Sequence, residues 1–225
     1  MKSALHETTS RRGNEVQIGV NGETLEGELI IPDRAQGVVI FAHGSGSSRF
    51  SPRNQFVART IRDAGCGTLL FDLLTREEEA ADRFSGHLRF DIPLLANRLV
   101  QTAQWLAEEP GMSDYKIGFF GSSTGGGAAL VAAAKLGANV HAVVSRGGRP
   151  DLAGDALPRV KCPTLLLVGE LDDVVIQLNE QAFAELHCPK ELRIIPGATH
   201  LFEEPGTLDQ VAKNAADWFK TYLND

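Results

Sequence analysis

The sequence predicts one α/β domain with a mostly parallel sheet and helices on both of its faces. Short apolar runs rich in β-branched and aromatic residues alternate with longer segments whose apolar residues recur every three to four positions. Continuous apolar strands separated by helices are typical of a parallel sheet that is covered on both faces. Two further strand-like segments, 15–20 and 24–31, are joined by Asn21 and Gly22, which suit a tight antiparallel hairpin.

The elements follow one another without a linker or an internal repeat. After the hairpin we expect strands at 38–42, 68–72, 116–120, 141–145, 164–169 and 192–197, and helices at 52–64, 92–108, 123–138, 176–187 and 207–223. The stretch 73–91 contains the acidic run EEEAAD, which indicates a solvated loop or a short surface helix. We therefore assign residues 15–225 to a single domain and residues 1–14 to an N-terminal tail.

Composition excludes several classes of function. The 225 residues are 43% hydrophobic and carry a formal net charge of -7, which argues against a nucleic-acid partner. No apolar stretch reaches the roughly 18 residues that a membrane span needs, and the N-terminus lacks the apolar core of a signal peptide. We expect a cytoplasmic protein, monomeric or homodimeric, that acts on a small molecule. The cysteines lack zinc-site spacing and are expected to be reduced and buried, with no metal site: Cys66, Cys162 and Cys188.

The segment 118–127, GFFGSSTGGG, follows a predicted strand and opens a predicted helix. Within it, Gly121, Ser123 and Gly125 match the pattern G-x-S-x-G, which places a serine hydroxyl on a sharp strand-to-helix turn. Such a turn strains the central residue, and side chains at the glycine positions would collide with neighbouring backbone. Ser122 is out of register with the glycines. The alternative interpretation is a glycine-rich turn in which Ser123 merely caps the helix.

A serine hydroxyl becomes a nucleophile only when a positioned base takes its proton. Asp172 follows the strand at 164–169, and His200 follows the last strand, so Ser123, Asp172 and His200 fall in the order that this type of sheet requires. Asp173 remains an alternative acid, and Glu170 a weaker one. Histidines in the tail, the long loop and at other element ends fit the role of base less well: His6, His87, His141 and His187.

Two backbone N–H groups could stabilise a developing oxyanion. One belongs to Thr124, at the start of the predicted helix. The other belongs to Ser45 or, as an alternative, to Gly44, in the HGSGSS loop after the first parallel strand, where His43 could shape the loop or contact substrate. A phosphate-binding loop is the competing interpretation of HGSGSS, but the segment lacks a lysine and has Arg49 where a dinucleotide motif needs glycine.

With HGSG, GSSTG, GELDDVV and GATH in this order, the chain resembles the α/β-hydrolases, and most closely the dienelactone-hydrolase-like branch without an inserted cap. The resemblance runs from about residue 15 to the C-terminus. It implies an α/β-hydrolase fold, no cofactor, and ester cleavage by Ser123, His200 and Asp172. Dienelactone hydrolases carry cysteine at the elbow. The serine of this chain therefore favours ordinary ester chemistry through a Ser-His-Asp triad.

The sequence also suggests how open the site is. Fewer than twenty residues separate Ser145 from Thr164, where lipases insert a lid domain, so we expect an open site with 73–91 as the only sizeable cover.

The SRGGRPD segment adds two candidate substrate-binding residues. Arg146 and Arg149 lie at the expected catalytic edge, where a guanidinium could clamp a carboxylate or phosphate of the substrate. The alternative is that they pair with acidic neighbours such as Asp151 or Asp155. From the sequence we expect a serine hydrolase of small or short-chain carboxylic esters. An acyltransferase with the same triad and a non-catalytic binding module on the same fold remain the alternatives.

Overall fold

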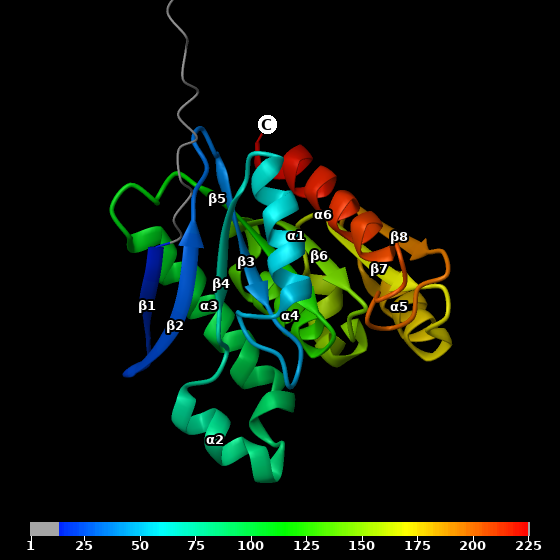
Figure 1. The fold of residues 1–225 in the computed structure, drawn as a ribbon, viewed down its shortest axis with the longest axis horizontal. Helices are drawn as coiled ribbons and strands as arrows, with labels where there is room; N and C mark the ends of the chain where they lie inside the picture. Colours follow the sequence, from blue (N-terminus) through cyan, green and yellow to red (C-terminus); the bar gives the residue numbers. More distant parts are fainter. Residues whose placement is uncertain (1–13, 225) are drawn as a thin grey trace, which may run out of the picture.

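The computed structural model describes residues 14–224, and these residues form one eight-stranded sheet (Figure 1). The spatial order of the strands is β1-β2-β4-β3-β5-β6-β7-β8. Strands β3 to β8 all pair in parallel, while β1 and β2 form an antiparallel hairpin that adds to the sheet against β4. The strands span β1 Asn14–Val20, β2 Glu23–Ile30, β3 Gly37–Ala42, β4 Gly67–Phe71, β5 Lys116–Ser122, β6 Val140–Arg146, β7 Thr164–Gly169 and β8 Lys190–Ile195.

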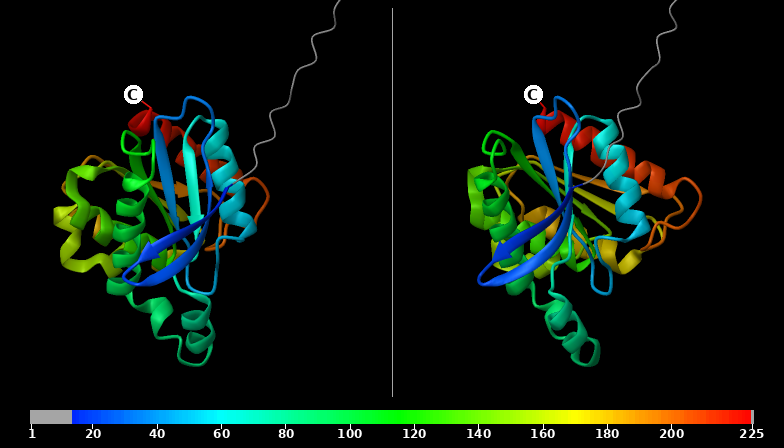
Figure 2. Two further views of the ribbon diagram at one scale, coloured as in Figure 1. Left: turned by 90° about the vertical axis from the view of Figure 1, so that its left-hand side faces the viewer. Right: turned by 60° about the vertical axis from the view of Figure 1, so that its left-hand side comes forward.

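Helices cover both faces of this sheet, as the apolar strands predict (Figure 2). Helices α1 and α6 pack together on one face, and α3, α4 and α5 lie on the other, so each face has its own hydrophobic core. The helices span α1 Pro52–Asp63, α2 Arg76–Ser85, α3 Ile92–Glu108, α4 Thr124–Leu136, α5 Asp173–Glu185 and α6 Thr207–Leu223, with 3₁₀ segments η1 Leu88–Phe90, η2 Gly137–Asn139 and η3 Pro150–Arg159.

The hairpin turn confirms its sequence signal. Asn21 and Gly22 both have positive φ, at 48° and 85°, which this tight turn requires and which few other residues adopt cheaply. Of the expected tail, residues 1–13 lie outside the described part of the chain, and Asn14 already belongs to β1.

The stretch 73–91 contains a ten-residue helix, α2, which projects from the body of the molecule (Figures 1 and 2). Thr75 and Glu78 form a reciprocal capping box at its start, and Gly86 ends it in the left-handed conformation. Asp82 fastens the far end by accepting hydrogen bonds from the Arg89 guanidinium and backbone. Of the two possibilities that the sequence left open here, a loop or a surface helix, the structure has the helix.

Nothing resembling a cap domain is inserted between β6 and β7, where only η3 intervenes.

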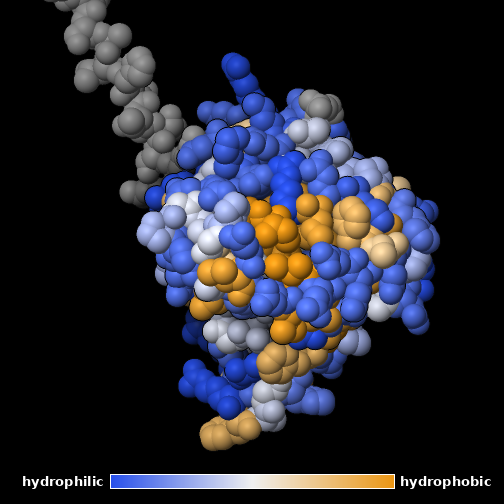
Figure 3. All heavy atoms as spheres, turned by 90° about the vertical axis from the view of Figure 1, so that its right-hand side faces the viewer, coloured by the Kyte–Doolittle hydropathy of each residue, from blue (hydrophilic) through white to orange (hydrophobic). Residues whose placement is uncertain are grey.

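The two outermost strands of the sheet are β1 at one end and β8 at the other. On the side of the molecule where β8 is outermost, hydrophobic residues gather at the surface (Figure 3). The exposed large hydrophobic residues after β7 in sequence are Leu171, Val174, Ile194 and Leu201. No helix within 14–224 is both long enough and apolar enough to span a bilayer.

Candidate active site

The turn between β5 and α4 has the strained geometry that its glycines predict. Ser123 has φ 50° and ψ -122°, in the region that residues with a side chain rarely adopt. A Cβ on Gly121 would lie 2.5 Å from the Gly125 carbonyl oxygen. A Cβ on Gly125 would lie 2.7 Å from the His43 carbonyl oxygen and nearer still to that of Ala42. Both glycines are therefore required by close backbone packing.

Ser123 occupies the N-cap position of α4, yet its side chain makes no capping hydrogen bond. The interpretation of this serine as a simple helix cap is therefore wrong. Its hydroxyl is left for the cleft that it lines. Ser122, in contrast, is buried and donates a hydrogen bond from its hydroxyl to the Asn54 side chain at 3.2 Å, which is a packing role.

Asp172 and His200 lie together at the C-terminal edge of the sheet. Asp172 precedes α5 and His200 follows β8, and Asp172 Oδ2 lies 2.7 Å from His200 Nδ1. The Asp172 side chain is 15% exposed and that of His200 is 40% exposed. Because the carboxylate engages Nδ1, Nε2 is the ring nitrogen that remains for another partner.

The two alternative acids have other positions. Asp173 lies in the first turn of α5, where a negative charge suits the helix dipole. Glu170 accepts a hydrogen bond from the Gly197 N–H at 2.7 Å and so ties the ends of β7 and β8 together. Helix α5 begins three residues earlier than its periodicity predicts, which makes Asp172 its N-cap residue.

The HGSGSS loop runs directly beside the elbow. A Cβ on Gly44 would lie 3.1 Å from the Ser123 Cβ, so the loop approaches this closely only because Gly44 lacks a side chain. The Ser45 N–H donates to the Thr124 hydroxyl at 3.0 Å. This bond brings the two expected oxyanion donors next to each other, but it also gives the Ser45 N–H a partner within the protein.

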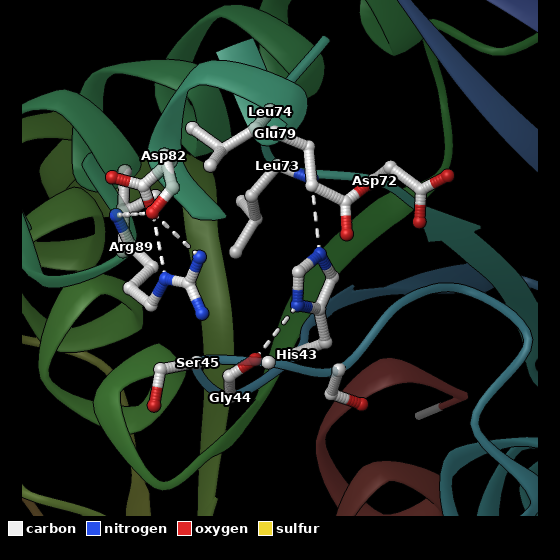
Figure 4. A pocket seen from close by; sticks show the side chains of 12 residues that line it. His43, Gly44, Ser45, Asp72, Leu73, Leu74, Glu79, Asp82 and Arg89 are labelled. Carbon is white, nitrogen blue, oxygen red and sulfur yellow. Dashed lines mark hydrogen bonds and ion pairs between the residues drawn. The ribbon is translucent and has the colours of Figure 1, made fainter. Parts of the chain in front are cut away.

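His43 is a structural residue of this loop (Figure 4). Its Nε2 accepts a hydrogen bond from the Leu73 N–H at 3.1 Å, so the proton must sit on Nδ1, which donates to the Gly44 carbonyl oxygen at 3.0 Å. Burial lowers the pKa of this imidazole, against the opposing effect of the Gly44 bond. Both nitrogens have partners within the protein, which fits the loop-shaping role that the sequence offered for His43 beside substrate contact.

A cleft of about 550 Å³ brings the pieces together, within the usual size range of ligand pockets. Ser123 and His200 both line it, together with Ser45 and its loop, and with Arg146. A smaller cavity of about 40 Å³ adjoins it between the HGSGSS loop and α2, and Glu79 lines both (Figure 4). No domain is inserted to cover it, and α2, from the stretch 73–91 that was expected as a cover, borders it through Glu79.

The two candidate arginines have different environments. Arg149 makes a bidentate ion pair with Asp151, with Nε–Oδ1 and Nη2–Oδ2 distances of 2.9 and 2.7 Å. The alternative of pairing with an acidic neighbour thus holds for Arg149. Arg146 is only 8% exposed, and its Nε and Nη1 have no hydrogen-bond partner within the described residues.

Comparison with known proteins fits this geometry. The dienelactone hydrolase family model matches residues 25–224. The chain belongs to the dienelactone hydrolase family. Within it, a crystal structure of dienelactone hydrolase from Anabaena variabilis is 57% identical, covers 94% of this chain and 98% of its own, and superposes with a TM-score of 0.93. At 16% identity, Est1E from Butyrivibrio proteoclasticus shares the fold, with a TM-score of 0.76 over 91% of this chain and 97% of its own.

A curated relative from Mycobacterium tuberculosis carries the name "Putative phosphoribosyl transferase". It is 55% identical over 212 residues, which cover 94% of this chain. The matched part makes up 47% of the relative, so the chain spans about half the length of this curated relative. The activity in that name belongs to a protein about twice as long.

One residue that fixes the loop after β8 was missed from the sequence. Glu204 accepts hydrogen bonds from both the backbone and the hydroxyl of Thr199, at 3.1 and 2.5 Å, and so fixes the loop that carries His200. The only available signal was its place in the loop after the last strand. Among residues 14–224, no group of three or more His, Cys, Asp or Glu side chains could hold a metal ion.

Proposed function

We propose that this member of the dienelactone hydrolase family cleaves carboxylic esters through an acyl-enzyme on Ser123. The observation that carries the proposal is the 2.7 Å contact between Asp172 and His200 Nδ1 in the same cleft as a strained, uncapped serine. With Nδ1 bound to the carboxylate, His200 Nε2 is the base for the Ser123 hydroxyl. Asp172 orients the ring and stabilises its charged form.

The reaction then has two halves. Ser123 Oγ attacks the ester carbonyl carbon while His200 takes the hydroxyl proton, and the same proton passes to the leaving alcohol as the C–O bond breaks. Water, deprotonated by His200, next attacks the acyl carbon; the bond from that carbon to Ser123 Oγ breaks, the acid leaves, and His200 returns the proton to Oγ. The oxyanion of each tetrahedral intermediate accepts hydrogen bonds from the N–H groups of Thr124 and Ser45.

The Ser45 N–H requires one additional step in this proposal. In the free protein it donates to the Thr124 hydroxyl, so the oxyanion must compete with that hydroxyl for the donor. A charged acceptor makes a stronger hydrogen bond than a neutral hydroxyl. The exchange therefore favours the oxyanion in the transition state over the neutral carbonyl of the bound substrate, as catalysis requires.

The test uses the two adjacent serines as a matched pair. Wild-type protein, Ser123→Ala and Ser122→Ala are incubated with p-nitrophenyl acetate and butyrate, and separately with a fluorophosphonate probe. We expect Ser123→Ala to lose at least about a thousandfold in kcat/KM and all labelling. Ser122→Ala removes only the bond to Asn54 and should retain both.

The outcomes separate the remaining possibilities. Hydrolysis by Ser123→Ala at the wild-type rate would contradict the mechanism. Absence of both labelling and turnover in the wild type, with a compound still bound in the cleft, would indicate a binding module. If an added alcohol saturates the protein and takes the acyl group in preference to water at millimolar concentration, the protein is an acyltransferase with the same triad.

A further inference from the structure

Strand β8 is the outermost strand at the end of the sheet nearest the proposed base (Figure 1). It pairs with β7 on one side, and within residues 14–224 no strand pairs with it on the other. Its six residues lie between Pro189 and Pro196. An uncovered strand edge presents a row of N–H and C=O groups to which another strand can add.

The side chains of β8 show that this edge is accessible. Those of Glu191 and Arg193 are 48% and 39% exposed, and Ile194 is 40% exposed. Hydrophobic residues gather at the surface on this side of the molecule (Figure 3). One of the exposed ones, Leu171, lies beside the end of β8, because its N–H donates to the Ala198 carbonyl oxygen at 2.9 Å. A strand that paired with β8 would therefore reach both free backbone groups and apolar surface.

Hydrogen bonds at the two ends of β8 show which of its backbone groups are turned outward. The Pro189 carbonyl oxygen accepts the Thr164 N–H at 2.9 Å, and the Ile195 carbonyl oxygen accepts the Glu170 N–H at 3.0 Å. Because the backbone groups of successive residues in a strand point to opposite sides, the odd-numbered residues of β8 face β7. The outward N–H and C=O groups belong to the even-numbered residues Lys190, Leu192 and Ile194.

The charges on β8 complement themselves in one antiparallel register. A two-fold axis perpendicular to the sheet keeps each side chain on its own face, so the axis must lie between a residue and its own copy. With the axis at Leu192, Glu191 of each copy lies opposite Arg193 of the other, which is a favourable cross-strand pair. With the axis at Glu191 or at Arg193, like charges would lie directly opposite each other, which is unfavourable.

The same register matches the free backbone groups. Leu192 would exchange both of its backbone hydrogen bonds with its copy, and Lys190 and Ile194 would exchange theirs at each end. Glu191 and Arg193 would then form the pairs without backbone hydrogen bonds, in which opposed side chains lie closest. The Lys190 ammonium donates to the Leu186 carbonyl oxygen at the end of α5, at 2.6 Å, which leaves its apolar stem to cover Ile194 of the other copy.

We propose that β8 forms the interface of a homodimer, in which the β8 strands of two copies pair antiparallel about Leu192 and join the two sheets into one. The strand at the opposite edge, β1, has Glu15 as its one charged residue, so no register of β1 with its copy opposes unlike charges. Because the paired strands run in opposite directions, the catalytic edges of the two copies face opposite ways and each cleft is built from one copy. The inference goes beyond the proposed ester cleavage and does not depend on it.

The test is the dissociation constant of the dimer, measured for the full chain by sedimentation equilibrium. We expect the wild type to be dimeric at about 100 μM and to dissociate on dilution, since strand pairing alone makes a small interface. Glu191→Arg and Arg193→Glu should each raise Kd at least about tenfold, because the symmetry gives every substitution two like-charge pairs. Combining the two substitutions reverses both charges and should restore Kd to within about threefold of wild type.

Controls separate the interface from the fold. Glu15→Arg makes the same charge reversal on β1 and should keep the wild-type Kd. Arg193 also donates to the Asn214 side chain of α6, so melting temperatures of dilute protein check that every variant folds. Hydrogen exchange tests the register: the Leu192 and Ile194 amides should exchange more slowly in concentrated than in dilute protein, while the Arg193 amide, which faces β7, should be protected in both.

The possible outcomes are distinct. A wild type that is monomeric at 100 μM would overturn the inference. So would a dimer whose Kd is unchanged by Glu191→Arg and Arg193→Glu, or whose association is not restored when the two are combined. A dimer weakened by Glu15→Arg alone would place the interface on β1 instead. Loss of association in both single variants, recovery in the combined one and concentration-dependent protection of the even-numbered amides would support pairing through β8.

Discussion

Replacing Asp172 by Asn would keep the shape of the side chain and remove the negative charge that faces His200. The 2.7 Å contact is made to Nδ1, so the carboxylate holds the ring with its proton on Nδ1 and leaves Nε2 to accept the Ser123 proton. An amide at this position can donate to Nδ1 instead, which would place the ring proton on Nε2. The substitution should therefore impair the base without disturbing the fold.

The size of the effect follows from the geometry. With charge centres about 4 Å apart and an effective dielectric constant of about 20, a carboxylate attracts an imidazolium by about 4 kcal/mol, which corresponds to a factor of about 10³ in rate. The His200 side chain is 40% exposed, so water screens part of this attraction. We expect Asp172→Asn to lower kcat/KM by roughly 10²- to 10³-fold.

The assay is hydrolysis of p-nitrophenyl acetate, with the rate of fluorophosphonate labelling as a second measure of serine reactivity. The adjacent Asp173 is the matched control, because it lies in the first turn of α5. Asp173→Asn should stay within about threefold of wild type, as expected for a surface substitution. Thermal unfolding checks that both variants fold. An Asp172→Asn protein with more than a third of wild-type activity, or an Asp173→Asn protein that falls as far as Asp172→Asn, would refute this assignment of the acid.

Three further predictions concern stability and thiol chemistry. Gly125→Ala should lower the free energy of unfolding, measured in urea, by at least about 2 kcal/mol. Gly19→Ala is the control: a Cβ there meets open space, so the free energy should change by less than about 1 kcal/mol, and equal effects of the two substitutions would contradict the packing argument. Burial raises the pKa of Cys66 to about 11 and that of Cys162 to about 12, so a thiol reagent at pH 8 should modify them only after denaturation, and rapid reaction in the native protein would be inconsistent with their burial. Burial raises the pKa of Asp82, but its hydrogen bonds with Arg89 and Leu88 outweigh burial and keep the pKa below the usual value. The contribution of Asp82 to stability is therefore present at neutral pH and is lost as the pH falls through that lowered pKa. The melting temperatures of the wild type and of Asp82→Asn should converge in acid.

Much of the fold follows from local patterns. Apolar runs locate the strands because parallel strands are buried on both faces and cannot alternate with polar residues. The elbow is equally local. In any such turn, a side chain two positions before or after the serine would clash with neighbouring backbone, so glycine is required at both positions. Chain order and strand ends then predicted that an acid after β7 would face His200, with Asp172 as the first candidate and Asp173 as the alternative.

The features that the sequence left undecided depend on contacts between distant elements. Helix α2 has no apolar stripe to reveal it, although the Thr75–Glu78 capping box and Gly86 were visible signals. The bond between the Ser45 N–H and the Thr124 hydroxyl joins residues 79 positions apart. Likewise, the sequence offered acidic partners for Arg146 and Arg149 alike. Only three-dimensional packing shows that, within the described part of the chain, Arg149 has an ion-pair partner and Arg146 does not.

Four side chains in or beside the cleft are carried by the ends of different strands: Ser123 follows β5, Arg146 ends β6, Asp172 follows β7 and His200 follows β8. A substitution at one strand end therefore leaves the residues at the other strand ends in place. An exchange at position 146 would alter the wall of the cleft while Ser123, Asp172 and His200 keep their places on the other strand ends. In proteins with this architecture, the residues at the separate strand ends can therefore diverge one at a time.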